Sequence, residues 1–113
     1  MATDSLAVLR GTLDLLILRS LSSRSLHGYA VMRWIEAATD HVLDIEEGSL
    51  YPALYRLEDR GWIESDWGLS ENNRRARYYR ITTLGRAQLK TEVREFTRFA
   101  KAVFRALEAP LSV

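Results

Sequence analysis

The chain has 113 residues, a length that fits one domain with an appended helix, and 47% of them are hydrophobic and 27% charged, as in ordinary globular proteins. It has no cysteine, which excludes disulfide frameworks, thiolate catalysis and cysteine-ligated zinc. No apolar run approaches the roughly 20 residues of a membrane span, so we expect a cytoplasmic protein with no membrane partner.

The formal net charge is only +1, but the charged residues are unevenly placed along the chain. Residues 1–71 carry 6 basic and 12 acidic side chains, and residues 91–113 carry 4 and 3. Between them, residues 72–90 hold only basic side chains: Arg74, Arg75, Arg77, Arg80, Arg86 and Lys90. Such a cluster favours an anionic partner such as nucleic acid more strongly than the net charge suggests.

Leucine and isoleucine at helical spacing predict a first helix over Leu9–Leu21. Apolar residues on its second side indicate that neighbours cover this helix on two sides. Ser22–Leu26 interrupts the pattern and predicts a turn or a very short strand. His27 and Gly28 then open a second helix, which fades near Asp40.

A third helix is predicted from about Ser49 to Arg60. Ser49 is a suitable N-cap, and Pro52 falls in the first turn, where its missing N–H removes no helical bond. Gly61 is expected to end the helix as a left-handed C′ residue. A leucine stripe on one side is assigned to the core: Leu50, Leu54 and Leu57.

Two runs rich in aromatic and β-branched residues follow, Trp62–Trp67 and Ala76–Thr82. They predict a β-hairpin with a long polar loop over Gly68–Arg75. Alternation along the strands places three side chains toward the core: Ile63, Tyr79 and Ile81.

The last helix is predicted from a cap at Thr82 or Thr83 to about Glu108. Its apolar residues follow the a/d pattern of a coiled coil over roughly two and a half heptads. A single terminal helix has nothing in its own domain to cover so long a seam, which favours a dimer; packing against the first helix is the alternative. The predicted dimer residues are Leu89, Val93, Phe96, Ala100, Val103 and Leu107.

This order of elements is that of a winged helix, because a helix-turn-helix is followed by a two-stranded wing. We predict a mainly α protein with a small β-hairpin (α+β). Residues 1–83 form a winged helix-turn-helix DNA-binding domain, and residues 84–113 form a C-terminal dimerisation helix.

In this fold the third helix enters a major groove ~12 Å wide while the wing meets neighbouring phosphates. Amide and guanidinium groups suit such contacts. The predicted DNA-binding residues are Ser49, Tyr51 and Arg56 on the helix, and Asn73, Arg74, Arg75 and Arg77 on the wing.

Each of these residues also has a purely structural interpretation. Ser49 can serve only as a cap, Tyr51 can edge the core, and the wing arginines can be solvated surface charge. Glu46 and Glu47 oppose phosphate binding near the start of the third helix, although their charge suits a helix N-terminus.

Several stretches together resemble the PadR-type transcriptional regulators: LHGY at residues 26–29, EGSLYPAL at 47–54, RLE at 56–58, GWI at 61–63, and RRARYYRIT at 74–82 followed by Gly85. The resemblance covers roughly residues 6–90. It implies a homodimeric transcriptional repressor that a small molecule can release from DNA. It implies groove or backbone contacts for Ser49, Tyr51 and Arg56, wing contacts for Arg74, Arg75 and Arg77, and structural roles for Gly28 and Gly61. The chain resembles the short members, whose single C-terminal helix leaves little room for a large effector pocket.

We predict no cofactor, no metal and no enzyme activity, because no catalytic motif occurs. A magnesium site on His41, Asp44, Glu46 and Glu47 is the weaker enzymatic alternative. A winged helix for protein–protein contact is the main alternative, and the all-basic wing argues against it. Trp34 and Phe99 are candidate effector contacts, although tryptophan at helical spacing is typical of a core. The expected partners are an inverted-repeat operator, a second copy of the chain and a small-molecule effector.

Overall fold

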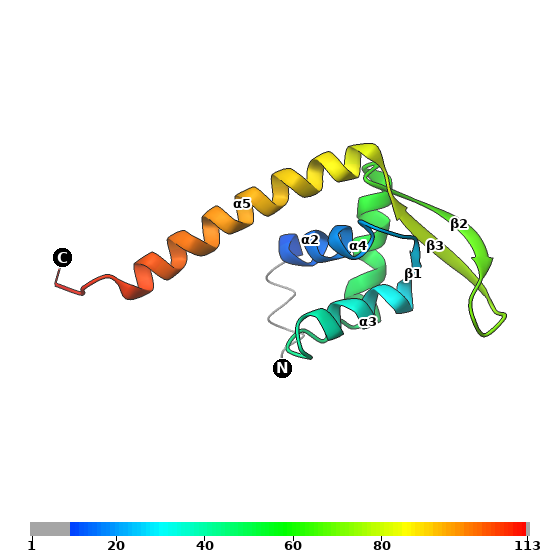
Figure 1. Cartoon of the computed structure of the whole chain (residues 1–113), viewed down its shortest axis with the longest axis horizontal. Coiled ribbons are helices and arrows are strands. Elements are labelled where there is room, and N and C mark those ends of the chain that lie inside the picture. Colours follow the sequence, from blue (N-terminus) through cyan, green and yellow to red (C-terminus); the bar gives the residue numbers. More distant parts are fainter. Residues whose placement is uncertain (1–9, 113) are drawn as a thin grey trace.

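The computed structural model describes residues 10–112. Within them the elements follow in the order α2 (Arg10–Ser20), β1 (Leu26–His27), α3 (Gly28–Ala38), α4 (Glu47–Asp59), β2 (Ile63–Leu69), β3 (Arg75–Ile81) and α5 (Thr83–Glu108). Helices α2, α3 and α4 form one body, with the β2–β3 hairpin at one end and α5 extending from the other (Figure 1). The predicted fold class, mainly helical with a small antiparallel sheet, is confirmed. Leu9, the predicted start of the first helix, lies outside the described residues.

The segment between α2 and α3 contains both a turn and a short strand. Leu26 and His27 form β1, which pairs with β3 opposite Tyr79 and Tyr78, so the sheet has the order β1-β3-β2. His27 is also the N-cap of α3, because its Nδ1 accepts a hydrogen bond of 3.1 Å from the Ala30 N–H.

Helix α4 begins two residues earlier than the sequence predicts. Its N-cap is Glu46, whose carbonyl oxygen accepts from the Leu50 N–H at 2.9 Å, and no side chain caps this end. Ile45 just before the cap and Leu50 belong to the same core cluster, which is the arrangement of a hydrophobic staple. Burial of Ile45 and Leu50 in one core accounts for the earlier start, and the prediction that Ser49 is the N-cap is wrong.

The earlier start also corrects the expected role of Pro52. Pro52 is the sixth residue of α4 and lies beyond its first turn. Its missing N–H therefore removes the bond that the Gly48 carbonyl would otherwise accept. At the other end the prediction is confirmed: Gly61 has φ +79°, and its N–H donates to the Glu58 carbonyl at 3.0 Å in a left-handed cap.

The hairpin has longer strands and a shorter loop than predicted. Ser70 donates its N–H to the Arg74 carbonyl at 2.8 Å, and Asn73 donates its N–H to the Ser70 carbonyl at 2.8 Å. Asn73 has φ +60°, so the loop is a turn followed by one left-handed residue, a common three-residue hairpin connection. The predicted long loop over Gly68–Arg75 is wrong because hydrogen bonding continues to Leu69 and Arg75.

The core lies between α2, α3, α4 and the base of the hairpin. Ile17, Leu18, Ile35, Leu50 and Leu57 are all 0% exposed. The three hairpin residues predicted to face the core are also buried: Ile63, Tyr79 and Ile81. The alternation of the strands therefore confirms which face of the hairpin covers the helices.

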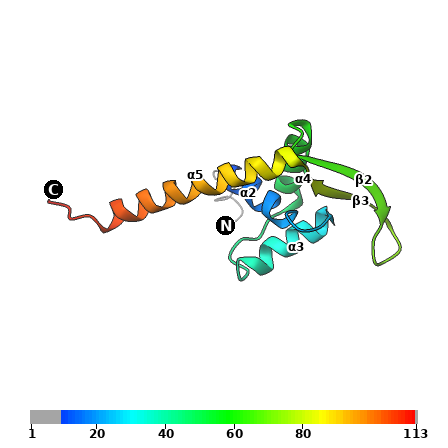
Figure 2. The same cartoon turned by 45° about the horizontal axis from the view of Figure 1, so that its top comes forward.

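Helix α5 starts on the body and then leaves it. Its N-cap is Thr82, as expected, whose Oγ1 accepts from the Gly85 N–H at 3.0 Å. A Cβ at Gly85 would overlap the Trp62 carbonyl oxygen, so this position needs glycine. Leu89 packs against the core, and α5 passes along α2 before extending beyond the body (Figure 2). No helix among residues 10–112 combines the length and apolar character needed to cross a bilayer.

Candidate nucleic-acid interface

The hairpin tip and the first turns of α3 and α4 enclose a concavity of about 580 Å³. Strand β1 contributes His27 to its lining, and the helices contribute Tyr29 and Tyr51. The hairpin contributes Trp67 together with residues 70–72 and 74–77. In a helix-turn-helix the first turn of the second helix, here α4, approaches base edges. The fold thus places the wing beside the end of α4 that would face DNA.

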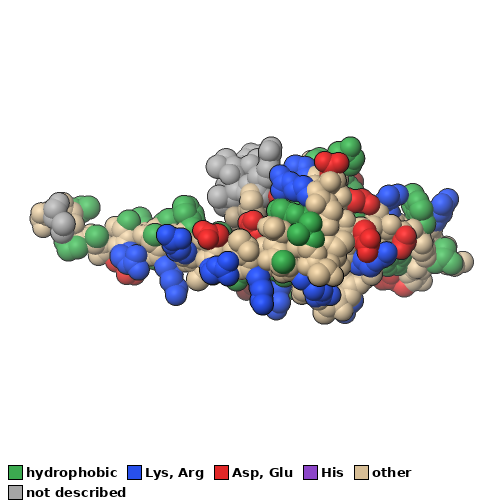
Figure 3. Space-filling view, turned by 90° about the horizontal axis from the view of Figure 1, so that it is seen from above, with side chains coloured by type: hydrophobic (Ala, Val, Ile, Leu, Met, Phe, Trp, Pro, Cys, Tyr) green, Lys and Arg blue, Asp and Glu red, His purple; other side chains and the backbone are tan. Residues whose placement is uncertain are grey.

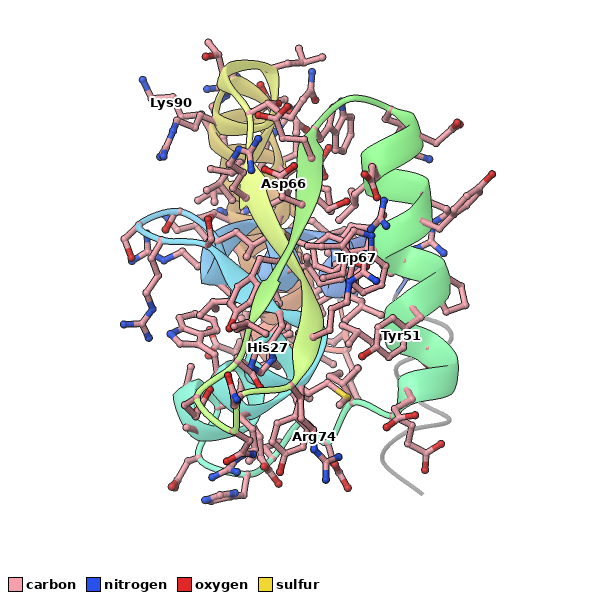
Figure 4. All side chains as sticks on the ribbon, turned by 90° about the vertical axis from the view of Figure 1, so that its right-hand side faces the viewer. His27, Tyr51, Asp66, Trp67, Arg74 and Lys90 are labelled. Atoms are coloured by element: carbon pink, nitrogen blue, oxygen red, sulfur yellow. The ribbon has the colours of Figure 1, made fainter. Side chains whose placement is uncertain are left out.

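Trp67 is the centre of a cation–aromatic stack on the inner face of the wing. Its indole is 56% exposed, with the Arg75 guanidinium 4.5 Å and the Arg77 guanidinium 5.5 Å from the ring centroid. Strand pairing causes this, because Trp67 lies directly opposite Arg77 and diagonally to Arg75. Figure 4 shows Trp67 between the hairpin and α4, on the side of Tyr51.

The wing arginines differ in how far carboxylates neutralise them. Arg80 bonds to Glu64 at 3.1 Å and to Asp66 at 2.6 Å on the neighbouring strand. Arg77 lies 3.8 Å from Glu58 and donates to the Ser65 hydroxyl at 2.8 Å. Of the six basic residues counted over residues 72–90, four lie on the hairpin, and two of these four face carboxylates. The sequence count therefore overstates the free charge of the wing.

Arg74 and Arg75 are the wing cations that keep their charge unopposed. Both are exposed, and neither forms an ion pair within residues 10–112. Arg74 lies near the hairpin tip (Figure 4), next to Asn73 at the left-handed loop position. Glu71, 84% exposed in the same loop, opposes an anion locally and lies 3.8 Å from His27 Nε2.

Tyr51 combines a packing contact with an accessible hydroxyl. The side chain covers Gly28, where an added Cβ would lie 2.6 Å from the phenol oxygen, yet the residue is 44% exposed. Burial, and to a smaller extent the Glu47 carboxylate, raise the pKa of Tyr51, so its hydroxyl stays protonated and can donate to a phosphate oxygen. Ser49 is half-buried in the first turn of α4.

Arg56 does not join the other predicted DNA-binding residues. Its Nη2 donates to Asp14 Oδ1 of α2 at 2.8 Å, and its side chain is 27% exposed. Arg60 at the end of α4 faces the same carboxylate, with its Nη1 3.9 Å from Asp14 Oδ2. Asp14 gave no signal in the sequence, because an acidic residue in a leucine-rich helix has no local pattern that names its partner.

The predicted dimer residues form an apolar stripe along α5. Leu89 is partly buried against the core and Ala100 is half-buried. The remainder are exposed by 39–75%: Val93, Phe96, Val103 and Leu107. Figure 3 shows hydrophobic side chains along α5 beyond the body, together with lysines and arginines.

A groove of about 550 Å³ lies between this stripe and α2. Phe96, Phe99 and Val103 line it from α5, and Leu15 lines it from α2. Of the two effector candidates, Phe99 is 62% exposed in this groove, whereas Trp34 packs against the core. The structure does not bring them together.

The sequence did not assign His27, Tyr29 or Trp67 to the interface. Strand alternation was the available signal for Trp67, since it shares a face with Arg75 and Arg77 once the register is known. In the described part of the chain, no three acidic or histidine side chains lie close enough to hold a metal ion.

Comparison with known proteins gives consistent matches. Residues 17–91 match the Transcriptional regulator PadR-like family. The transcriptional regulator Rv3488 of Mycobacterium tuberculosis is 32% identical over 95 residues, which cover 83% of this chain and 84% of that protein. A transcriptional regulator from Clostridium thermocellum is 35% identical with a TM-score of 0.79, covering 88% of this chain and 96% of the other. A PadR family regulator from Eggerthella lenta is 30% identical with a TM-score of 0.76, covering 95% and 92%.

Proposed function

The chain belongs to the PadR-like family of transcriptional regulators, and we propose that it is a homodimeric repressor of an inverted-repeat operator in double-stranded DNA. Because the family consists of transcriptional regulators, the chain is a regulator and not an enzyme. The observation that carries the DNA-binding site is the pair of unopposed arginines, Arg74 and Arg75, beside the exposed first turns of α4.

In the proposed complex α4 lies in a major groove and the wing follows the adjacent phosphates. Tyr51 donates its hydroxyl to the backbone, and Arg74 and Arg75 bind phosphate at the hairpin tip. Further contacts come from Ser49, Asn73 and Arg77. Arg56 is left out of this set, because its guanidinium is bound to Asp14.

The dimer is proposed through α5, since an exposed apolar stripe of this length is uncommon on a monomer. A second copy would cover the stripe and the groove against α2. Two α4 helices would then meet successive major grooves, with half-sites ~34–36 Å apart. The exposed Phe99 ring in this groove suits a small apolar effector. Binding of the effector there would change the distance between the two α4 helices.

The decisive experiment is selection of bound duplexes from a random pool with the full chain. We expect an enriched inverted repeat whose half-site centres are about 10 base pairs, or a multiple of one helical turn, apart. The Arg74→Ala/Arg75→Ala variant is the control and should enrich it weakly. A pool with no enrichment would contradict DNA binding and favour a winged helix that contacts protein.

A further inference from the structure

We propose that Asp14 is a positioning residue of the DNA-binding site, which holds Arg56 and Arg60 on the α2 side of α4 and keeps both cations off the phosphate backbone. The inference rests on the proposed function, because it concerns how α4 meets DNA. It assigns Arg56 a role opposite to that of a DNA contact.

The contact between α2 and α4 is a short, shielded ion pair. Asp14 is 8% exposed, and its partner Arg56 lies 42 residues further along the chain at 2.8 Å. The second oxygen of Asp14 lies 3.9 Å from Arg60, whose guanidinium also stacks 5.2 Å from the Trp62 ring. One carboxylate therefore faces two cations, Arg56 within α4 and Arg60 at its C-cap.

This arrangement leaves the outward face of α4 without a basic side chain. The face opposite the buried leucines carries Gly48, Pro52 and Tyr55. Arg56 lies four residues beyond Pro52, so it is the surface neighbour of this face on the next turn. A rotation of its side chain would bring the guanidinium onto the face that meets DNA.

Arg56 depends on Asp14 for its present orientation. Guanidinium groups keep their charge at all accessible pH values, so the side chain needs an anion or water wherever it lies. Its Nε is buried and finds no acceptor within residues 10–112. Without the Asp14 carboxylate the bound orientation loses its charged partner, and the phosphate backbone beside α4 becomes available to the guanidinium in the complex.

The consequence concerns specificity. Each phosphate contact raises affinity for every sequence and steepens the salt dependence, whereas base contacts discriminate between sequences. By holding Arg56 back, Asp14 lowers non-specific binding without removing a base contact. The ratio of operator affinity to non-specific affinity is then higher than it would be if Arg56 also bound phosphate.

The test measures the salt dependence of binding for the full chain with Asp14→Asn, Arg56→Gln and both together. The probes are the duplex enriched by selection and a mixed-sequence duplex of equal length, followed by fluorescence anisotropy. Asp14→Asn should steepen the salt slope by about 0.9 for each arginine released in each bound protomer. One released arginine in each protomer of the proposed dimer steepens it by about 1.8, so that affinity falls about 12-fold further between about 50 and 200 mM salt. The operator preference should decrease in parallel.

Arg56→Gln provides the variant that keeps the proposal falsifiable if Asp14→Asn folds poorly. It should leave the salt slope unchanged. In the double variant with Asp14→Asn, it should remove the part of the increase in salt slope that Arg56 causes. A slope flattened by about 0.9 per protomer in Arg56→Gln alone would show that Arg56 binds phosphate in the native protein and would overturn the proposal. A folded Asp14→Asn variant with the native slope would overturn it as well. Absence of binding to either duplex by the unmodified chain would refute the proposed function itself.

Discussion

Removing the two unopposed wing arginines, in an Arg74→Ala/Arg75→Ala variant, should weaken DNA binding for every sequence. Neither side chain forms an ion pair within the described residues, so each is available to a phosphate. Arg75 also stacks on Trp67, which holds the guanidinium in place before DNA arrives. The substitutions remove surface charge without exposing the core, so the fold should remain intact.

The size of the effect follows from counterion release. Each lost phosphate contact lowers the slope of log affinity against log salt by about 0.9, so two contacts lower it by about 1.8 per protomer. Between about 50 and 200 mM salt this makes the salt-induced loss of affinity about 12-fold smaller for each protomer, and about 150-fold smaller for the proposed dimer with two wings. Anisotropy titrations at four salt concentrations measure the slope directly.

Arg80→Ala is the matched control, because Arg80 is on the same hairpin but is bound to Glu64 and Asp66. Its slope should stay close to that of the native protein. An unchanged slope in Arg74→Ala/Arg75→Ala would show that the wing does not meet phosphate. An equal loss in Arg80→Ala would show that total charge, and not the free arginines, sets the binding.

Three further predictions concern assembly and stability. Phe96→Asp/Val103→Asp should sediment as a monomer, because dimerisation would bury unpaired charge; a persisting dimer would exclude this seam. Gly85→Ala should lower the free energy of unfolding in urea by about 1–3 kcal/mol, because the new Cβ overlaps a neighbouring carbonyl. Gly48→Ala has open space at its Cβ and should raise that free energy by about 0.5–1 kcal/mol. Equal effects of the two substitutions would contradict the packing. Pro52→Ala should raise the free energy of unfolding by about 1 kcal/mol by restoring a helical hydrogen bond, and an unchanged value would show that this bond is not formed.

Elements controlled by near neighbours in the chain could be predicted closely. The leucine stripe of α4, the Gly61 cap and the Thr82 cap depend on contacts between residues three to five positions apart. The start of α4 could not be predicted in this way. It depends on burial of Ile45 in the shared core, and a serine of good capping type at position 49 therefore misled the assignment.

The position of the wing was predicted from the sequence, but the pairing of its charges was not. The element order of a winged helix predicts the wing beside the third helix, and the hairpin tip does line one concavity with Tyr51 of α4. The extent of the strands was missed, since the three-residue loop depends on Asn73 adopting a left-handed conformation. Trp67 could not be assigned to the arginine stack until the register placed it opposite Arg77.

The sequence by itself determined the order of helices and strands and the presence of a basic wing, because periodicity and composition are local properties of the chain. Its short motifs carried the resemblance to the family. Only the tertiary structure decided which of those charges are free. Arg56 is bound to a carboxylate 42 residues away, and Arg80 is neutralised by carboxylates across the hairpin. Coulomb energy depends on the distance between groups in space, and that distance exists only after the chain has folded.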